Sequence, residues 1–429
     1  MERPRVLRPL RERDFALLFT GITVSLLGDG IYLVAIAWQV YDISNVPTAL
    51  SLVGVAWTLP MVLFLLIGGV LADRFERRRL LIASDIVRGL AIAGIGVISL
   101  TGAIELWHVV VLVAVYGIGQ ALFAPAHEAT IPEIVPRPLL LQANSLYELA
   151  EPIAYRFAGP ALGGLLVAGL GPGPAFLADA ATFGFSALCV SLMSSRGGRL
   201  AETPGFEQIR GEIGESLKFV RSRAWLWATL LAAATTLLLF MGPFEVLLPY
   251  VVRNEFGGGA EALGLVFAAA GLGAIGSALW IAQRGRLLQR HVLWMYLGWT
   301  VAVGSLAGYA IATATWQAML IGILEGAFLT IGNVTWFTLL QLHVPNEMLG
   351  RVSSLDWLVS FGLTPVSFAL AGPAAEAFGV ETTMIAAGVG GALLTLAFLL
   401  VPGIRDPERW AEEERREAEL AAAASGGRP

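Results

Sequence analysis

The chain has 429 residues, of which 56% are hydrophobic and only 14% are charged, and its formal net charge is −5. With a mean hydropathy of +0.71, it has too few polar residues to cover the exterior of a soluble protein of this length. The single cysteine excludes an intramolecular disulfide, and no basic block is large enough to indicate nucleic-acid binding.

Apolar runs recur from one end of the chain to the other. An α-helix of about 20 residues crosses the hydrocarbon core of a bilayer, which is roughly 30 Å thick. The first run follows the basic segment 1–14 without a small-residue cleavage site, so we interpret it as a span and not as a signal peptide. The predicted spans are residues 15–40, 48–72, 80–101, 107–130, 143–168, 174–195, 225–252, 261–283, 292–312, 316–340, 354–377 and 381–401. The sequence therefore predicts an all-α membrane protein with twelve transmembrane helices.

Basic residues lie almost entirely on one side of these spans. Of the 28 lysine and arginine residues, 25 fall in the terminal segments and connections of that side, whereas the connections of the other side carry only Arg253. Cytoplasmic loops carry an excess of basic residues. The pattern predicts a multi-pass protein of the inner, cytoplasmic membrane with both termini in the cytoplasm.

The chain also contains a weak internal repeat. When it is shifted by 209 residues, eight identities join the fourth and fifth spans to the tenth and eleventh. The matched pairs are Gly117 and Gly326, Val135 and Val344, Pro136 and Pro345, Leu140 and Leu349, Ser145 and Ser354, Leu146 and Leu355, Leu149 and Leu358, and Gly163 and Gly372. Six spans separate the copies, so both have the same orientation, as in transporters whose two halves rock about a central site.

The repeat divides the chain into two six-helix halves. The predicted segments are a cytoplasmic N-terminus at 1–14, a six-helix bundle at 15–195, a cytoplasmic linker at 196–224, a second six-helix bundle at 225–401 and a cytoplasmic tail at 402–429. In the linker, apolar residues recur every three or four positions at Phe206, Ile209, Ile213, Leu217 and Val220. This spacing predicts an amphipathic helix on the cytoplasmic surface.

The connection after the second span combines glycine, an acid and several arginines. Glycine lets helices approach closely, an acid can lie against a helix N-terminus, and arginines can bind carboxylates or lipid phosphates. We interpret the cluster as a conformational latch that breaks when the cytoplasmic side opens, with Asp356 as a candidate partner for the arginines. A simple positive anchor at the membrane surface is the alternative. The cluster comprises Gly69, Asp73, Arg74, Arg77 and Arg78.

Two motifs resemble signatures of the major facilitator superfamily. The connection after the second span matches G-x-L-a-D-r-x-g-r-[RK], with Glu76 where the family usually has glycine. The G-P-x-x-G-G core of the motif associated with the antiporters of this superfamily is matched in the fifth span by Gly159, Pro160, Gly163 and Gly164. Proline and small residues also bend a span and permit tight packing, so a purely structural role is the alternative.

The closer resemblance is to the drug:proton antiporter branch, which includes macrolide-efflux and enterobactin-export proteins. It rests on residues 27–29, 132–136, 143–146, 341–345 and 350–352. The resemblance implies the major facilitator fold, a monomer without cofactors, and proton-driven efflux of amphipathic small molecules such as antibiotics by alternating access. The arginine that many drug antiporters carry in the fourth span is absent, since Val113 occupies its place.

Charged residues inside spans are the candidates for proton coupling and substrate binding, because each is costly in hydrocarbon unless it faces a cavity or a partner. We place most weight on Asp29, with Tyr32 on the same helix face as its expected hydrogen-bond donor. Burial favours the neutral carboxyl form, so Asp29 could exchange a proton as its surroundings alternate between wet and dry. Fixed ion pairs of Arg156 with Glu151 or with Asp29 are the alternatives. The further candidates are Glu148, Glu151, Arg156, Glu245 and Glu325.

Other acids inside the spans receive less weight. Asp85 and Arg88 are three positions apart near a cytoplasmic span end, so we interpret them as a structural ion pair. Asp179 and Asp356 lie near predicted span ends, where we expect water to reach them.

Sequence patterns of other protein classes are missing. The only lysine, Lys218, is not part of a P-loop, the four histidines show no HExxH spacing, and no GxSxG motif occurs. We therefore expect no enzyme activity, no metal and no cofactor, and we expect a small amphipathic substrate, protons and the lipid bilayer as partners. Two alternatives stay open: an exporter of a siderophore, lysolipid or other metabolite, and a membrane enzyme or non-transporting sensor.

Overall fold

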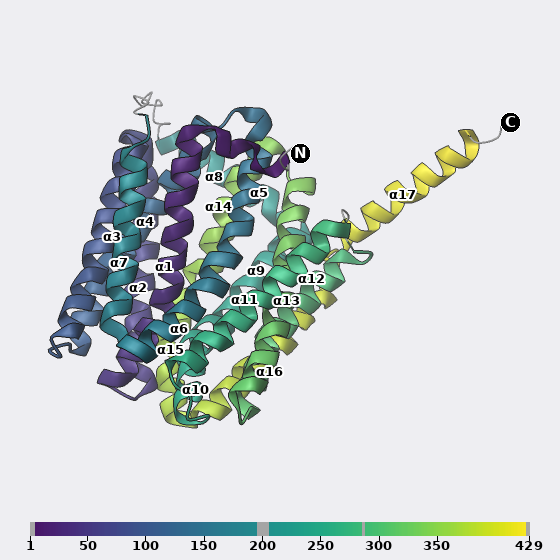
Figure 1. Cartoon of the computed structure of the whole chain (residues 1–429). Helices are drawn as coiled ribbons and strands as arrows, with labels where there is room; N and C mark the ends of the chain where they lie inside the picture. The colour runs from purple at the N-terminus through teal and green to yellow at the C-terminus, as the bar shows by residue number, and fades with distance from the viewer. Residues whose placement is uncertain (1–4, 195–205, 285–287, 426–429) are drawn as a thin grey trace.

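Long apolar helices form two bundles that lie side by side (Figure 1). The computed structural model describes residues 5–194, 206–284 and 288–425, and these residues form helices and connections without a β-strand. Within these described ranges, twelve helical segments are long and apolar enough to cross a membrane. The predicted fold class, an all-α membrane protein with twelve spans in two six-helix halves, is confirmed.

The N-terminal half contains the first six spans. Each is an apolar run that satisfies its backbone hydrogen bonds within the helix, as hydrocarbon requires. Each lies within a few residues of its predicted range. The elements are α1 (Arg13–Ile43), α2 (Pro47–Arg74), α3 (Arg77–Leu100), α4 (Leu106–Ile134), the fifth span with α5 (Leu140–Glu151), η3 (Pro152–Ala158) and α6 (Gly159–Leu170), and α7 (Pro172–Ser191).

The C-terminal half contains the other six spans. The helix of the eleventh span starts at Asn346, before its predicted start at residue 354, because hydropathy marks the hydrocarbon-facing part of a helix and not its end. The elements are the seventh span with α9 (Ala224–Gly242), η4 (Pro243–Leu247) and α10 (Leu248–Asn254), α11 (Ala260–Arg284), α12 (His291–Ile311), α13 (Thr315–His343), the eleventh span with α14 (Asn346–Gly362) and α15 (Thr364–Phe378), and α16 (Val380–Ala397).

In the described part of the chain, two further α-helices lie outside the spans, and the short 3-10 helix η1 (Arg5–Arg11) precedes the first span. The first, α8 (Phe206–Arg221), forms a helix in the predicted linker. From the predicted apolar stripe, Val220 packs in a core cluster with Trp225, whereas Leu217 is exposed; the side chains of residues 206–213 lie outside the described ones. The second, α17 (Asp406–Ser425), projects away from the C-terminal half (Figure 1).

The fifth and seventh spans are each interrupted by a π-helical turn. Each turn begins with a proline, Pro152 in η3 and Pro243 in η4. Proline has no N–H group to donate to the preceding turn, so the regular α-helical ladder is broken there. π-Helical turns occur frequently at functional sites, and these two carry the predicted site residues Arg156 and Glu245.

The internal repeat is visible where the halves meet. The rings of Tyr41 and Tyr250 lie 5.7 Å apart, and Asn45 donates to Asn254 at 2.7 Å across a separation of 209 positions, which is also the separation of the two tyrosines. Residues related by a twofold axis contact each other only beside that axis. These contacts therefore support the offset of the repeat and place all four residues next to the pseudo-twofold axis.

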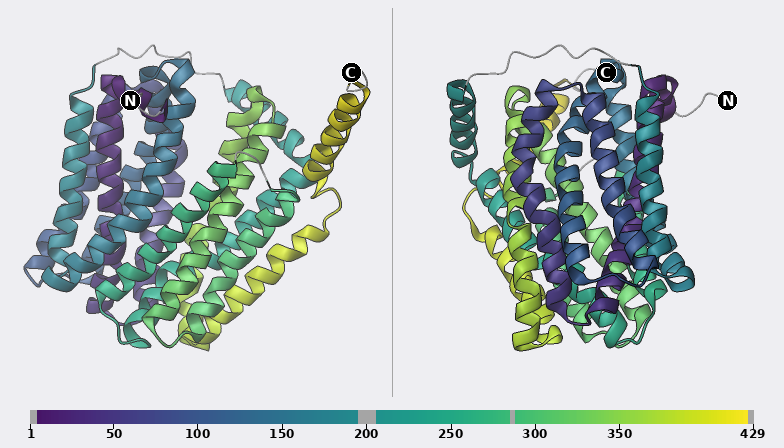
Figure 2. Two further views of the ribbon diagram at one scale, coloured as in Figure 1. Left: turned by 45° about the vertical axis from the view of Figure 1, so that its right-hand side comes forward. Right: turned by 90° about the vertical axis from the view of Figure 1, so that its left-hand side faces the viewer.

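The two halves are joined at the end predicted to face outward. There, Arg253 Nη1 lies 2.7 Å from Asp42 Oδ1, and Thr48 Oγ1 donates to Glu376 at 2.6 Å. Toward the end predicted to be cytoplasmic the bundles splay apart (Figure 2). With respect to the predicted topology, the conformation is closed outside and open inside.

Candidate functional site

Glycines of the fifth span bring that span against both halves. A Cβ atom on Gly159 would lie 2.6 Å from the Cα of Gly30 in α1, and one on Gly164 would lie 2.9 Å from the oxygen of Ala260 in α11. Real Cβ atoms essentially never approach this closely, so these crossings require glycine. The motif thus has a packing role, because it brings α1 and α11 into contact with the segment that carries Arg156.

Asp29 lies in the middle of α1 and is partly exposed. Tyr116 in α4 donates its hydroxyl to Asp29 Oδ1 at 2.8 Å. Tyr32 stacks on Tyr116 instead, with ring centroids 5.4 Å apart. The prediction that Tyr32 is the donor is therefore wrong. The hydroxyl of Tyr116 reaches the Asp29 carboxylate from α4, and the ring of Tyr32 stacks on the ring of Tyr116.

The predicted ion pair of Asp85 and Arg88 in α3 is confirmed, and both side chains are at most 2% exposed. Arg88 also donates to Gln120 at 2.8 Å. Its guanidinium carbon lies 4.0 Å from the centroid of the Phe123 ring and 4.6 Å from that of Phe183. A cation over an aromatic face is stabilised by the ring quadrupole. Arg88 is therefore held in place, and Asp85 balances its charge.

Asp179 in α7 is fully buried, with 0% of its surface exposed. The prediction that water reaches Asp179 is wrong, because α7 packs along α1 and α3 and Asp179 is buried in that contact. Gly28 leaves the space for this packing, since a Cβ atom there would collide with Asp179 Oδ1 and Thr182. Asp179 and Asp29 interact electrostatically. In the sequence, the only signal for this interaction is the position of Asp179 inside a predicted span.

A second group of charges lies where the halves face each other. Arg156 Nε lies 3.1 Å from Glu151 Oε1, which confirms their pairing, and the side chains are 43% and 41% exposed. Arg156 also interacts electrostatically with Glu245 and Glu325 of the other half. We call these four residues the interface cluster. The fixed pair of Arg156 with Asp29 is not formed; Arg156 bonds to Glu151 and Asp29 to Tyr116.

Glu148 and Tyr309 extend the interface cluster. Glu148 is exposed on α5 and interacts electrostatically with Glu151. Glu325 is only 3% exposed and lies close enough to Tyr309 to interact with it electrostatically. The Tyr309 hydroxyl has no hydrogen-bond partner within the part of the chain that is described. The cluster therefore combines exposed and buried carboxyl groups around one guanidinium.

The predicted latch is described only in part, since Gly69, Asp73 and Arg74 lie outside the residues whose side chains are described. Arg77 Nη1 lies 2.7 Å from Glu133 Oε1 and donates to the carbonyl oxygen of Ala129 at 2.6 Å. Arg77 therefore ties the start of α3 to the end of α4 within one half.

Among the arginines whose side chains are described, neither Arg77 nor Arg78 forms the predicted pair with Asp356 in this conformation. Arg78 Nε donates to the carbonyl oxygen of Val190 at 3.1 Å. Asp356 is 6% exposed and accepts hydrogen bonds from Trp336 at 3.1 Å and Ser360 at 3.3 Å. The prediction is corrected because the halves are splayed apart on this side, and each residue bonds within its own half.

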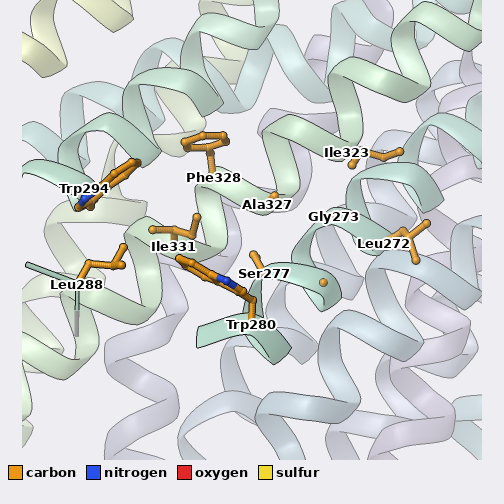
Figure 3. A pocket seen from close by; sticks show the side chains of 11 residues that line it. Leu272, Gly273, Ser277, Trp280, Leu288, Trp294, Ile323, Ala327, Phe328 and Ile331 are labelled. Carbon is orange, nitrogen blue, oxygen red and sulfur yellow. The ribbon is translucent and has the colours of Figure 1, made fainter. Parts of the chain in front are cut away.

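An apolar groove of about 490 Å³ lies between α11, α12 and α13 (Figure 3). Trp280, Trp294 and Phe328 contribute to its walls, and no titratable side chain lines it. It contains none of the predicted coupling residues. Within the described ranges, no group of three or more His, Cys, Asp or Glu side chains is arranged to hold a metal ion.

Twelve spans in two repeated halves, with charged side chains between them, define a multi-pass membrane transporter. The family model described as "Transmembrane secretion effector", from the major facilitator superfamily, matches residues 5–422, and the chain belongs to this family.

Curated relatives and solved structures agree with this assignment. The chain is 28% identical to the multidrug efflux pump Tap of Mycolicibacterium fortuitum, over 91% of this chain and 96% of that protein. It is 23% identical to macrolide efflux protein A of Streptococcus pyogenes, over 87% and 92%. A bacterial homologue of the iron transporter ferroportin, solved in an inward-facing state, has the same fold, with a TM-score of 0.66, 18% identity, and 90% and 98% coverage.

Proposed function

We propose that this transporter exports amphipathic small molecules, antibiotics among them, in exchange for protons. The cargo is supported by relatives that are named as multidrug and macrolide efflux proteins and that align over most of the chain. The observation that carries proton coupling is Asp29, a partly exposed carboxyl group at mid-span whose hydrogen bond comes from another helix. An ionisable group in that position is a functional-site candidate by default, because hydrocarbon disfavours its charge.

The conformation fits the loading state of an exporter. In the proposed topology, both termini are cytoplasmic, the protein is a monomer in the inner membrane, and the splayed end admits substrate from the cytoplasm. The bundles at 15–195 and 225–401 rock about the pseudo-twofold axis, while 196–224 links them and 402–429 is a cytoplasmic tail. Substrate binds between the halves, where the interface cluster offers carboxylates beside one guanidinium.

Drug accumulation in an efflux-deficient host tests the proposal. Cells that express the protein are expected to accumulate several-fold less of a lipophilic dye or macrolide than cells with an empty vector. A protonophore should restore accumulation, because no P-loop is present in the sequence to supply another energy source. Accumulation that stays low after the proton gradient has collapsed would contradict proton coupling.

Transport assays with purified protein in proteoliposomes test the identity of the cargo and the source of energy separately. An imposed pH gradient should drive dye uptake into vesicles, and Asp29→Asn should abolish the gradient-driven part. Uphill transport of any solute rules out an enzyme or a sensor. Unchanged susceptibility across a broad drug panel, together with gradient-driven transport of a siderophore or lysolipid, would favour the metabolite exporter instead.

A further inference from the structure

A buried carboxyl oxygen without a partner lies beside Asp29. Asp179 is 0% exposed, and its Oδ2 atom has no hydrogen-bond partner among the residues that the structure describes. Its other oxygen is within 3.3 Å of the Thr182 hydroxyl. An ionised carboxylate with a bare oxygen in an apolar interior is strongly disfavoured, whereas a protonated one is tolerated. The bare oxygen therefore points to a bound proton.

The charges around Asp179 do not balance without such a proton. Three acids, Asp29, Asp85 and Asp179, lie near one cation, Arg88, which forms an ion pair with Asp85. Ionisation of all three would leave two negative charges without a counter-ion in the core of one bundle. The other titratable groups that face this region are Tyr32 on α1, Tyr116 on α4, Tyr155 on η3, Glu245 on η4 and His127 on α4, which interacts with Arg88. The tyrosines and Glu245 add no positive charge. The Nε2 atom of His127 is buried without a hydrogen-bond partner among the described residues, which disfavours the charged ring.

We propose that Asp29 and Asp179 form a two-carboxyl proton-binding site, in which Asp179 stores a proton that Asp29 exchanges with the space between the halves. The transfer is balanced: the Asp179 carboxyl O–H bond breaks, the proton joins the Asp29 carboxylate, and the pair keeps the same total charge. Two carboxyl groups that share a buried site cannot both be ionised, so they behave as one unit. The proposal rests on the proposed function only for its role in export.

The local packing makes this pairing specific. Because residue 28 has no side chain, Asp179 Oδ1 and Thr182 lie directly over the backbone next to Asp29. Tyr116 holds Asp29 Oδ1 at 2.8 Å, and Asp29 is the partly exposed member of the pair. The pair therefore has one buried carboxyl group, Asp179, and one partly exposed carboxyl group, Asp29. A site that takes up and releases a proton requires this combination.

Infrared spectroscopy on the purified wild-type protein tests the site without any transport. The C=O stretching band of protonated carboxyl groups is followed during a pH titration, with aspartate carrying a ¹³C label. Beside the titration of the other aspartates, the wild type is expected to show two coupled steps from this pair, and Asp29→Asn and Asp179→Asn should each leave one of them. Asp356→Asn is the matched control, since it removes a buried carboxyl of the other half that has its own donors; it should leave both steps unchanged.

The outcomes separate this proposal from the proposed function. Two unchanged steps in Asp179→Asn, or in Asp29→Asn if the first variant does not fold, would overturn the shared site. If export is proton-driven but the titration steps are the same in the wild type, Asp29→Asn and Asp179→Asn, this proposal is refuted and the proposed function is not. Loss of the second step without any proton dependence of export would uphold the site and refute the proposed coupling. If both hold, Asp179→Asn should lower proton-driven export about tenfold or more, which corresponds to ~1.4 kcal/mol.

Discussion

Asn45 and Asn254 donate to each other's side-chain oxygens, at 2.7 and 3.2 Å, although 209 positions separate them in the chain. They are the same position in the two repeats, so the contact joins one half to its own counterpart at the pseudo-twofold axis. Any movement that opens the predicted outer side must break this pair together with the nearby ion pair of Asp42 and Arg253. The outer contacts therefore act as the closed gate of this conformation.

Removal of the gate ion pair should favour the outward-open state. Arg253 and Asp42 are 26% and 40% exposed, and partly exposed pairs contribute roughly 0.2–1 kcal/mol. Arg253→Ala is therefore expected to raise thiol labelling of Thr48→Cys by up to about fivefold, measured in a Cys189→Ser background.

Arg284→Ala is the control for this prediction, since Arg284 stacks on Trp280 at the opposite end of the molecule. Asp42→Asn combined with Arg253→Ala should add little to the effect of either single variant. Labelling that does not change in Arg253→Ala would show that the pair does not hold the gate.

The crossing of the fifth and eighth spans should be intolerant of a single methyl group. A Cβ atom on Gly264 would collide with the oxygen of Pro160 and lie 2.9 Å from the Cα of Gly164. Overpacking of a tight contact costs about 1–3 kcal/mol, so Gly264→Ala should lower the melting temperature in detergent by several degrees. Gly276→Ala in the same helix is the control, because nothing lies within 4 Å of its Cβ position. Equal melting temperatures for the two variants would contradict the prediction.

The latch hypothesis predicts slower transport without misfolding. Arg77→Ala and Asp73→Asn should each lower export several-fold, because they alter the balance between two conformations and leave the substrate site intact. Glu133→Gln, which removes the partner of Arg77 at 2.7 Å, should have the same effect, and the double variant should match the single ones. Wild-type export and unchanged cysteine accessibility at the cytoplasmic end in Asp73→Asn would refute the latch.

Asp29→Asn keeps the shape of the side chain and removes its titration. We expect loss of gradient-driven export, with expression and substrate binding retained, because the neutral amide carries no exchangeable charge across the cycle. Tyr116→Phe, which removes the hydrogen bond of 2.8 Å to Asp29, should give an intermediate rate. Proteoliposome uptake at several pH values measures both. Export by Asp29→Asn with the pH dependence of the wild type would show that the proton is carried elsewhere, and Glu325 and Glu245 would be the next residues to test.

Much of the fold could be predicted from the sequence because the membrane imposes rules that act along the chain. Hydrocarbon thickness sets the length of each apolar run, so twelve spans were recognisable without knowledge of their packing. Short-range charge pairs were equally accessible: Asp85 and Arg88 are one helical turn apart, and Glu151 and Arg156 lie within the same span. The repeat offset also came from matching residues alone.

Contacts between helices that are distant in the chain could not be predicted in this way. Tyr116, not Tyr32, donates to Asp29, and Asp356 bonds to Trp336 and not to Arg77 or Arg78, the latch arginines whose side chains are described. Each of these outcomes depends on the rotation of a helix about its axis and on the conformation of the whole transporter. Neither the rotation of a helix nor the conformation of the transporter can be predicted from local hydropathy.

The amino-acid sequence by itself determined the spans, the predicted sidedness and the relation between the two halves, because each follows from the chemistry of single segments in a bilayer. Only the tertiary structure decided that Asp179 is buried beside Asp29 and that the halves are closed at Asn45 and Asn254. Those facts arise from packing α7 on α1 and one half on the other. A pairing between segments about 150 or more residues apart is fixed by close contact of surfaces, not by the pattern within either segment.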